Sequence, residues 1–245
     1  MPKEELTVQP DDGFVLVFDC ESDCSFTNCP GENVKEKVSK FMQFTTICAA
    51  TLPTNLILSN IPVDDVMRQA SRYHWWRDES KPGQTPIDGL LALFDRADVI
   101  VGFNALHFDF PLIRRFYRSV KPDETPTQRY FNHRSKCHDI MARVRDVTDL
   151  YYKLDDLLKF NHIPCKTSDG LQAITMWEEQ RRQELLDYCA ADVDLTARLA
   201  LLDDISIDKR RDSVCYSVGV RSALLKKDLI VKRKRKIEEE EYVLV

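Results

Sequence analysis

The sequence has 245 residues, of which 43% are hydrophobic, and 35 Lys and Arg against 40 Asp and Glu give a net charge of −5. This hydrophobic content is sufficient for a packed core, while the negative charge argues against a nucleic-acid partner unless acids hold cations or local basic segments bind it. No apolar run could span a bilayer, the N-terminal residues are too polar for a signal peptide, and the eight scattered cysteines favour reduced thiols. We therefore expect an intracellular protein, cytoplasmic or nuclear, that binds no membrane.

A buried strand begins the ordered part of the chain. Residues 14–18 are all apolar and do not alternate with polar ones, which is typical of a strand buried on both faces in the middle of a sheet. Asp19 and Glu21 follow it, and residues two apart on a strand point to the same face. Two adjacent carboxylates repel each other unless a positive group lies between them, so this pair predicts a site for a divalent metal ion.

The next part of the chain is expected to add strands. Residues 22–39 contain turn-forming residues and predict a connecting loop, and residues 42–52 favour a second strand. Residues 55–61 are interpreted as a third strand, and the pattern over residues 63–76 favours a helix. Together the strands predict an antiparallel meander.

A second buried strand also leads to an acid. Residues 86–96 predict a helix that packs against the sheet, and residues 99–103 predict the strand. The chain then passes through Asn104 to Asp109, where a further helix is expected. Arg114 lies on the face of that helix opposite its apolar residues, where it is well placed to contact a substrate backbone.

The last strong element is a long helix over residues 183–201, which contains neither Gly nor Pro. A short strand over residues 136–140 and a short helix over residues 153–160 precede it, and loops with Pro164 and Gly170 are expected between this short helix and the long one. Tyr188 and Asp192 are four residues apart on the long helix, in one stripe with two leucines, so both are expected to face inward. A polar pair on a buried stripe is typical of a functional site.

The composition changes after this helix. A basic block over residues 232–236 precedes an acidic block over residues 238–241, a pattern typical of a solvated tail or of a segment that binds a protein partner. The sequence therefore predicts three parts: a flexible N-terminus over residues 1–12, one folded domain over residues 13–205 and a charged C-terminal extension over residues 206–245.

Three motifs occur in order along these elements. They are Asp19-Cys20-Glu21, Asn104-x-x-x-Phe108-Asp109 and Tyr188-x-x-x-Asp192. Their order and their placement resemble the DEDD superfamily of 3′–5′ exonucleases, which have a ribonuclease H-like fold. The third motif resembles that of the tyrosine subclass, which has a tyrosine four residues before the last acid. The histidine subclass instead has His five residues before that acid, where this chain has Asp187.

The resemblance implies a fold and an activity. The fold would be α/β, with an RNase H-like mixed β-sheet flanked by α-helices. The activity would be that of a two-metal-ion exonuclease that releases nucleoside 5′-monophosphates from the ends of single-stranded DNA or RNA. Ligation by oxygen alone favours Mg²⁺ or Mn²⁺ over zinc. The ligands would be the four acids of the motifs: Asp19, Glu21, Asp109 and Asp192.

The resemblance also implies roles for single residues. Asp19 would bridge both ions, Asp109 would serve the second ion, and Tyr188 would orient the attacking water. Asn104 would support either the substrate or the second motif, and a side chain that only stabilises a turn is the alternative. Phe108, together with Arg114, is assigned to substrate binding.

Two other functions use the same residues. A nucleic-acid-binding or scaffold protein would keep the fold without turnover, although such a protein has no need to confine so many acids. A metal-dependent, structure-specific endonuclease would share the chemistry and differ in its products. A zinc site is disfavoured, because Cys20, Cys24 and Cys29 include no Cys-x-x-Cys pair. Residues 22–39 also form a longer loop than the simplest pattern of the family.

Overall fold

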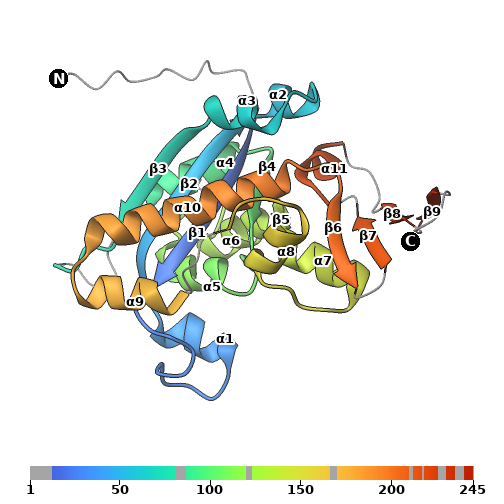
Figure 1. Ribbon diagram of the computed structural model, residues 1–245. Coiled ribbons are helices and arrows are strands. Elements are labelled where there is room, and N and C mark those ends of the chain that lie inside the picture. Colours follow the sequence, from blue (N-terminus) through green and yellow to red (C-terminus); the bar gives the residue numbers. More distant parts are fainter. Residues whose placement is uncertain are drawn as a thin grey trace.

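The computed structural model describes residues 13–80, 87–119, 123–165, 170–209, 212–216, 218–225, 230–234 and 240–244 (Figure 1). The flexible N-terminus predicted for residues 1–12 lies outside the described residues. Among the described residues, none of the helices combines the length and apolar character that crossing a bilayer requires.

A five-stranded mixed sheet forms the centre of the protein, in the order β3-β2-β1-β4-β5. β1 pairs antiparallel with β2 and parallel with β4; β2 pairs antiparallel with β3, and β4 pairs parallel with β5. The strand bounds are β1 Phe14–Ser22, β2 Phe44–Pro53, β3 Ser71–Trp76, β4 Val99–Gly102 and β5 Cys137–Asp139. This arrangement confirms the predicted α/β class and the RNase H-like mixed sheet.

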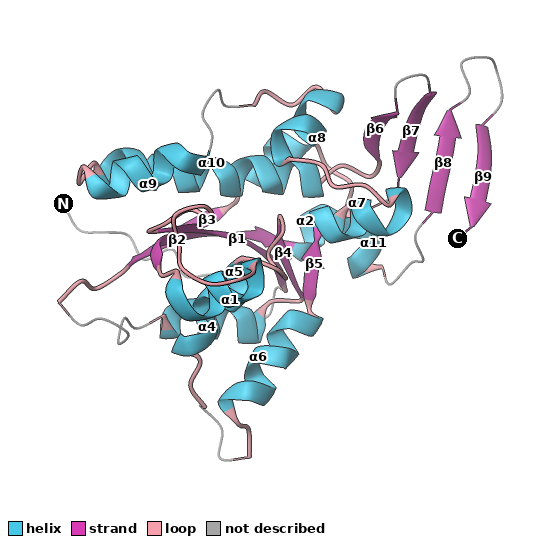
Figure 2. Cartoon of the chain, turned by 90° about the horizontal axis from the view of Figure 1, so that it is seen from below, coloured by secondary structure: helices cyan, strands magenta, loops and turns pink. Residues whose placement is uncertain are grey.

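Helices cover both faces of the sheet, as the edge-on view in Figure 2 shows. The helices are α1 Val34–Glu36, α2 Thr54–Leu58, α3 Val63–Arg68, α4 Asp88–Arg96, α5 Asp109–Ile113, α6 Pro126–Ser135, α7 Ile140–Thr148, α8 Leu154–Phe160, α9 Gly170–Glu178, α10 Arg182–Ala200 and α11 Val220–Leu224, with a π-helix at Lys37–Phe41 and a 3-10 turn at Arg114–Phe116.

The alternation of β1 divides the core into two layers. Val15 and Val17 pack with residues of α8 and α10 on one face. Leu16 and Phe18 pack with residues of α4 and α5 on the other. Since side chains alternate along a strand, Asp19 and Glu21 continue the Val15 and Val17 series and face α10.

The meander was predicted correctly, but its third strand was misplaced. Residues 55–61 do not form a strand, because α2 occupies Thr54–Leu58. Residues 63–76 are not one helix: α3 ends at Arg68 and β3 begins at Ser71. β3 alternates between more and less exposed residues and is rich in aromatic side chains, a pattern that suits an edge strand and overrides the helical spacing before it.

A second, four-stranded antiparallel sheet follows α10, in the order β6-β7-β8-β9. Its strands are β6 Ile205–Lys209, β7 Asp212–Tyr216, β8 Ile230–Lys234 and β9 Glu240–Leu244. Ile207 and Tyr216 are buried in the same core layer as Val15 and α10. The charged extension predicted from the sequence therefore contains strands, and its first part packs on the larger core.

Candidate metal-dependent active site

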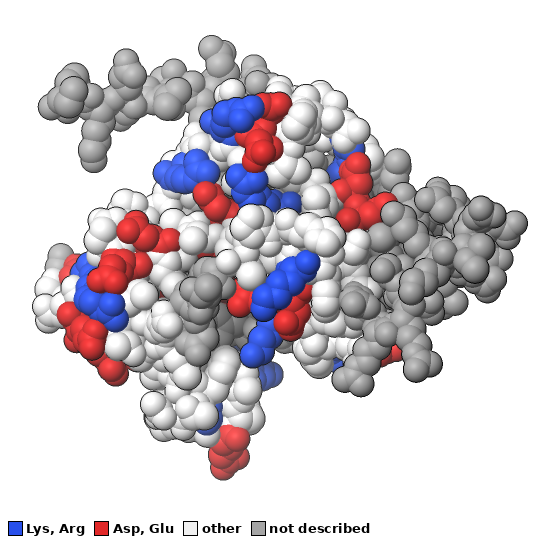
Figure 3. Space-filling view, viewed as in Figure 1, with Lys and Arg blue, Asp and Glu red and all other residues white. Residues whose placement is uncertain are grey.

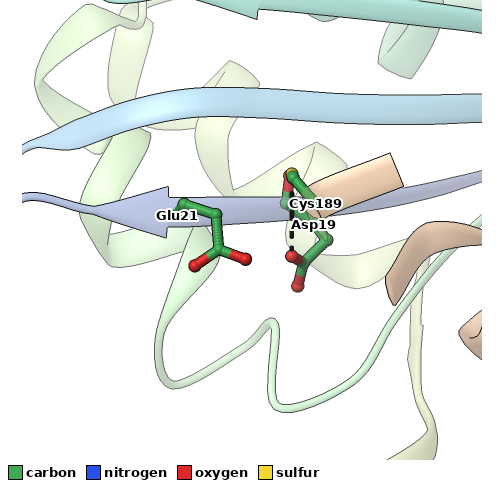
Figure 4. A group of neighbouring side chains, drawn as sticks. All are labelled: Asp19, Glu21 and Cys189. Carbon is green, nitrogen blue, oxygen red and sulfur yellow. Dashed lines mark hydrogen bonds between the residues drawn. The ribbon is translucent and has the colours of Figure 1, made fainter. Parts of the chain in front are cut away.

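β1 brings two carboxylates to one point of the sheet. Ligand oxygens of Asp19 and Glu21 lie within 4.8 Å of each other, and Figure 4 shows both side chains on the same side of the strand. Both lie on β1, which continues to Ser22, and not beyond its end as predicted. β4 pairs with β1 only as far as Val17, so the part of β1 that carries the acids extends past this neighbour.

α10 adds a tyrosine and a third acid. Tyr188 and Asp192 line the same cavity as Asp19 and Glu21, which has a volume of about 360 Å³. The helix is held against the sheet by Cys189 and Val193, which are buried in the core layer of Val15. The spacing of four residues thus places the phenol and the carboxylate on the cavity side, as predicted.

Burial, together with the neighbouring acids, favours the neutral form of the Tyr188 phenol. Burial raises its pKa well above the ordinary value, and the carboxylates of Asp192, Glu21 and Asp19 raise it further, in that order. A neutral phenol keeps its proton and can donate a hydrogen bond, for example to a water molecule in the cavity.

Cys189 lies against Asp19 and was not anticipated from the sequence. Its Sγ donates to the backbone oxygen of Asp19 at 3.6 Å and lies 3.8 Å from the carboxylate Oδ2 (Figure 4). Burial, followed by the nearby Cys48 and the acids, raises the pKa of the thiol well above its usual range. Only a thiolate is a good metal ligand, so Cys189 acts as a weak donor that orients Asp19.

Asp109 occupies a different place from the other predicted acids. It is 1% exposed, and its Oδ1 accepts a hydrogen bond of 2.8 Å from the backbone N–H of Cys20. It does not line the cavity. The structure therefore brings Asp19, Glu21, Tyr188 and Asp192 together and attaches Asp109 to the backbone between Asp19 and Glu21.

The three residues assigned to substrate binding lie in different places, and only one of them lines the cavity. Phe108 lines the cavity, and its ring packs edge-on against that of Phe26 with 5.8 Å between centroids. Asn104 forms a left-handed turn, with a φ of 64°. The guanidinium of Arg114 lies over the ring of Tyr130 at 5.1 Å, and Arg114 is not among the residues that line the cavity.

The cavity also has an apolar wall. Part of it comes from the long loop after β1 and part from α9, a helix that was predicted as loop. The wall residues are Phe26, Met42, Phe108, Leu171 and Ile174. Residues 166–169, just before α9, lie outside the described residues.

The donor set fits a hard divalent cation. Carboxylate oxygens from Asp19, Glu21 and Asp192 border one half-open cavity, and the neighbouring thiol is protonated. Oxygen ligands of this kind suit Mg²⁺ or Mn²⁺. On the face seen in Figure 3, basic and acidic side chains lie next to one another. Ion pairs of the described residues include Arg72–Asp194 and Arg198–Asp64.

The metal-free protein should become less stable as the pH rises toward 8. Burial raises the pKa of Asp109 from its ordinary value of 3.8 to about 7, so the folded state binds this proton more tightly than the unfolded state. The stability it confers is present at low pH and is lost as the pH rises through about 7. Asp109→Asn keeps an acceptor for Cys20 and needs no ionisation, so it should be more stable than the wild type at pH 8 by about 1–3 kcal/mol. Urea unfolding in EDTA at pH 5 and pH 8 measures this; equal pH dependence in both proteins would contradict it.

Comparison with known proteins gives a family and distant structural similarities. A family model described as the RNase_H superfamily matches residues 60–202. No curated protein matches the sequence. The family B DNA polymerase of the hyperthermophilic archaeon Pyrobaculum calidifontis has 16% identity and a TM-score of 0.48, with 76% of this chain and 24% of that chain covered.

Two structures of exonuclease I are also similar. The product-bound structure has 17% identity and a TM-score of 0.39, and covers 72% of this chain and 46% of that chain. The complex with the inhibitor BCBP has 16% identity and a TM-score of 0.37, and covers 72% of this chain and 43% of that chain. The chain thus spans less than half the length of these proteins.

Proposed function

The chain belongs to the RNase H superfamily, and from this premise we propose that it is a metal-dependent nuclease that hydrolyses phosphodiester bonds. The observation that carries the proposal is the cavity that is lined by Asp19 and Glu21 of β1 and by Tyr188 and Asp192 of α10. These two pairs are far apart in the sequence, since 167 positions separate Glu21 from Tyr188. Confining three carboxylates at one place is unfavourable unless a cation binds there.

We further propose the specific activity of a 3′–5′ exonuclease of the tyrosine subclass that acts on single-stranded DNA or RNA. The three sequence motifs support this proposal, because they occur in order on β1, at the start of α5 and on α10. The cavity is also lined by two unlike kinds of side chain. Its acids suit a scissile phosphate with its metal ions, and the rings of Phe26 and Phe108 suit a nucleobase.

The residues of the cavity and those next to it would have different roles in the reaction. Asp19, Glu21 and Asp192 would hold Mg²⁺ or Mn²⁺, and Asp109, which bonds the N–H of Cys20, would serve a second ion. When bound, such ions supply charge stabilisation and a nucleophile at neutral pH. Tyr188 holds its proton and would orient the attacking water through its hydroxyl. Cys189 donates to Asp19 and limits the movement of that carboxylate.

The folded unit that carries this activity is proposed to extend beyond residue 205. The side chain of Asn161, the residue that follows α8, accepts from the backbone N–H of Ser206 at 2.7 Å and donates to its C=O at 3.0 Å. The Nε2 atom of His138 on β5 lies 2.6 Å from the backbone oxygen of Val218. The hairpin of β8 and β9 places basic Arg233 opposite acidic Glu241 in register, and this last part is the proposed segment for a protein partner.

A product analysis tests the proposed activity. Single-stranded DNA and RNA oligonucleotides labelled at the 5′ end are incubated with the protein and Mg²⁺ or Mn²⁺, with EDTA as the control. We expect a ladder that shortens from the 3′ end and mononucleotide products. Internal cuts would instead identify an endonuclease, and binding without any cleavage would identify a non-catalytic binding protein; either result would contradict the proposal.

Tyr188→Phe should separate water orientation from metal binding. The variant keeps the ring that packs between α9 and α10 and removes only the hydroxyl. We expect kcat to fall about 100-fold, since positioned proton-bearing groups contribute about 10²-fold or more. KM and Mn²⁺ affinity should not change. Steady-state kinetics with calorimetric Mn²⁺ titration measures both, and a variant with wild-type kcat would rule out this role for the hydroxyl.

A further inference from the structure

Asp139 is a buried carboxylate at the end of β5, and it belongs to none of the three sequence motifs. It is 1% exposed. Its Oδ1 accepts hydrogen bonds from the backbone N–H of Asn104 at 2.9 Å and of Ala142 at 3.2 Å, and its Oδ2 accepts from the N–H of Leu106 at 2.9 Å. The bond to Ala142 caps the N-terminus of α7, and a cap alone would need only one oxygen.

The other two bonds support the turn between β4 and α5. Asn104 adopts a left-handed conformation there, with a φ of 64°, which asparagine tolerates better than most residues with a side chain. Two backbone N–H groups of this turn, those of Asn104 and Leu106, are bonded from outside the turn. Asp139, 35 and 33 residues away in sequence, binds them with its two oxygens.

The supported turn leads directly to the cavity. It continues into Phe108, which lines the cavity, and into Asp109, which binds the N–H of Cys20 at 2.8 Å. Cys20 lies between Asp19 and Glu21 on β1. A continuous path of hydrogen bonds and backbone thus joins Asp139 to the strand segment that carries two of the proposed ligands.

We propose that Asp139 is a positioning residue of the nuclease site, which fixes the turn of residues 104–108 and, through Asp109, the backbone that presents Asp19 and Glu21. The inference rests on the proposed function. Asp139 touches neither the cavity nor any group expected to react, so it acts only through the turn. An ordinary helix cap uses one side-chain oxygen, whereas both carboxylate oxygens of Asp139 accept hydrogen bonds.

The chemistry of the amide explains why asparagine should not replace it. Asp139→Asn has one acceptor oxygen, and its NH₂ group would face one of the two N–H donors of the turn. Asp139→Ala removes every acceptor. Groups that orient metal ligands from outside typically change metal affinity or activity about 10- to 100-fold when they are replaced.

The test compares Asp139→Asn and Asp139→Ala with a matched control. Asp95→Asn alters another carboxylate that is bound by several donors, Arg129 and His133 of α6, but Asp95 lies on α4 and does not line the cavity. For each protein, Mn²⁺ binding is measured by calorimetry without substrate, cleavage of a single-stranded oligonucleotide is measured across Mn²⁺ concentrations, and urea unfolding reports stability.

Both Asp139 variants should need about 10- to 100-fold more Mn²⁺ for binding and for half-maximal cleavage, with an unchanged substrate KM at saturating Mn²⁺. Asp95→Asn should lose stability and keep the wild-type Mn²⁺ affinity. Asp139 variants that bind Mn²⁺ as the wild type does, and lose only stability, would overturn the positioning role. A wild-type protein that neither binds Mn²⁺ nor cleaves would overturn the proposed function itself, so the two failures are distinguishable.

Discussion

Replacing Asp19 by asparagine is expected to abolish metal-dependent cleavage, with kcat reduced by at least about 10³-fold, as for the loss of a residue central to a catalytic unit. Asp19 lies beside Glu21, shares its cavity with Asp192 and Tyr188, and is contacted by Cys189. An amide has the shape of the carboxylate but not its charge. It would therefore leave the cavity intact and weaken its hold on a divalent cation.

The same substitution should not destabilise the metal-free protein. Removing one of several neighbouring negative charges reduces their repulsion, so urea unfolding in EDTA should show equal or greater stability than for the wild type. Added Mn²⁺ should stabilise the wild type by mass action and the variant much less. Kinetics and unfolding with and without Mn²⁺ measure these effects.

Asp194→Asn is the matched control for Asp19. It changes an acid on the same helix as Asp192, but one that pairs with Arg72 at the surface, with 3.0 Å between the charged atoms. It should keep wild-type cleavage and Mn²⁺ stabilisation. If Asp19→Asn also kept them, Asp19 would not be a metal ligand and the proposed site would be wrong.

Arg129→Met is expected to have the largest effect on stability, about 3 kcal/mol, because it removes the buried partner of an ion pair whose carboxylate, Asp95, is 32% exposed. Arg129 is 2% exposed; it binds Asp95 at 2.7 and 3.3 Å and the backbone oxygen of Arg118 at 2.9 Å. His133 completes the network from 2.8 Å. The substitution leaves Asp95 and the Arg118 oxygen short of donors and does not reach the cavity, so the folded variant should still cleave.

The network should also determine part of the acid stability. Burial opposes the charge of Asp95, but hydrogen bonds from Arg129 and His133 outweigh it and lower the pKa of the carboxyl. A lowered pKa contributes stability that is present above the unfolded value and is lost as the pH falls through the folded value. Arg129→Met should therefore lose most stability near neutral pH and less in acid.

Denaturant unfolding measures the loss of stability in Arg129→Met, and two further variants serve as comparisons. Arg68→Ala removes a surface pair with Asp65 and should change stability by less than about 1 kcal/mol. The double variant Arg129→Met with Asp95→Leu replaces both charges and should be more stable than Arg129→Met alone. A single variant as stable as the wild type would show that the pair contributes little.

Local periodicity was enough to predict the parts of the site that lie on regular elements. On β1 a period of two places Asp19 and Glu21 on one face, and on α10 a spacing of four places Tyr188 above Asp192. These relations follow from backbone geometry within a few residues, so they hold whatever the rest of the chain does. The mixed sheet was implied only by the resemblance to the exonuclease superfamily, since the strand patterns by themselves predicted an antiparallel meander.

Elements with weaker local signals were missed. The strand expected over residues 55–61 is a helix, and α9, which supplies Leu171 and Ile174 to the cavity, was predicted as loop. Short segments carry little intrinsic preference, and packing against the sheet decides their conformation. The loop after β1 likewise gave no indication that Phe26 would face Phe108.

The sequence by itself determined the strand and the helix that carry the cavity acids, because hydrophobic runs and regular spacing are local properties. Only the tertiary structure decided where Asp109 binds, since its partner Cys20 is 89 residues away, and only the structure assigned Asp139 to the turn of Asn104. The direction of a side chain at a turn depends on donors and acceptors that the fold brings together from distant parts of the chain, and no periodicity along the sequence records them.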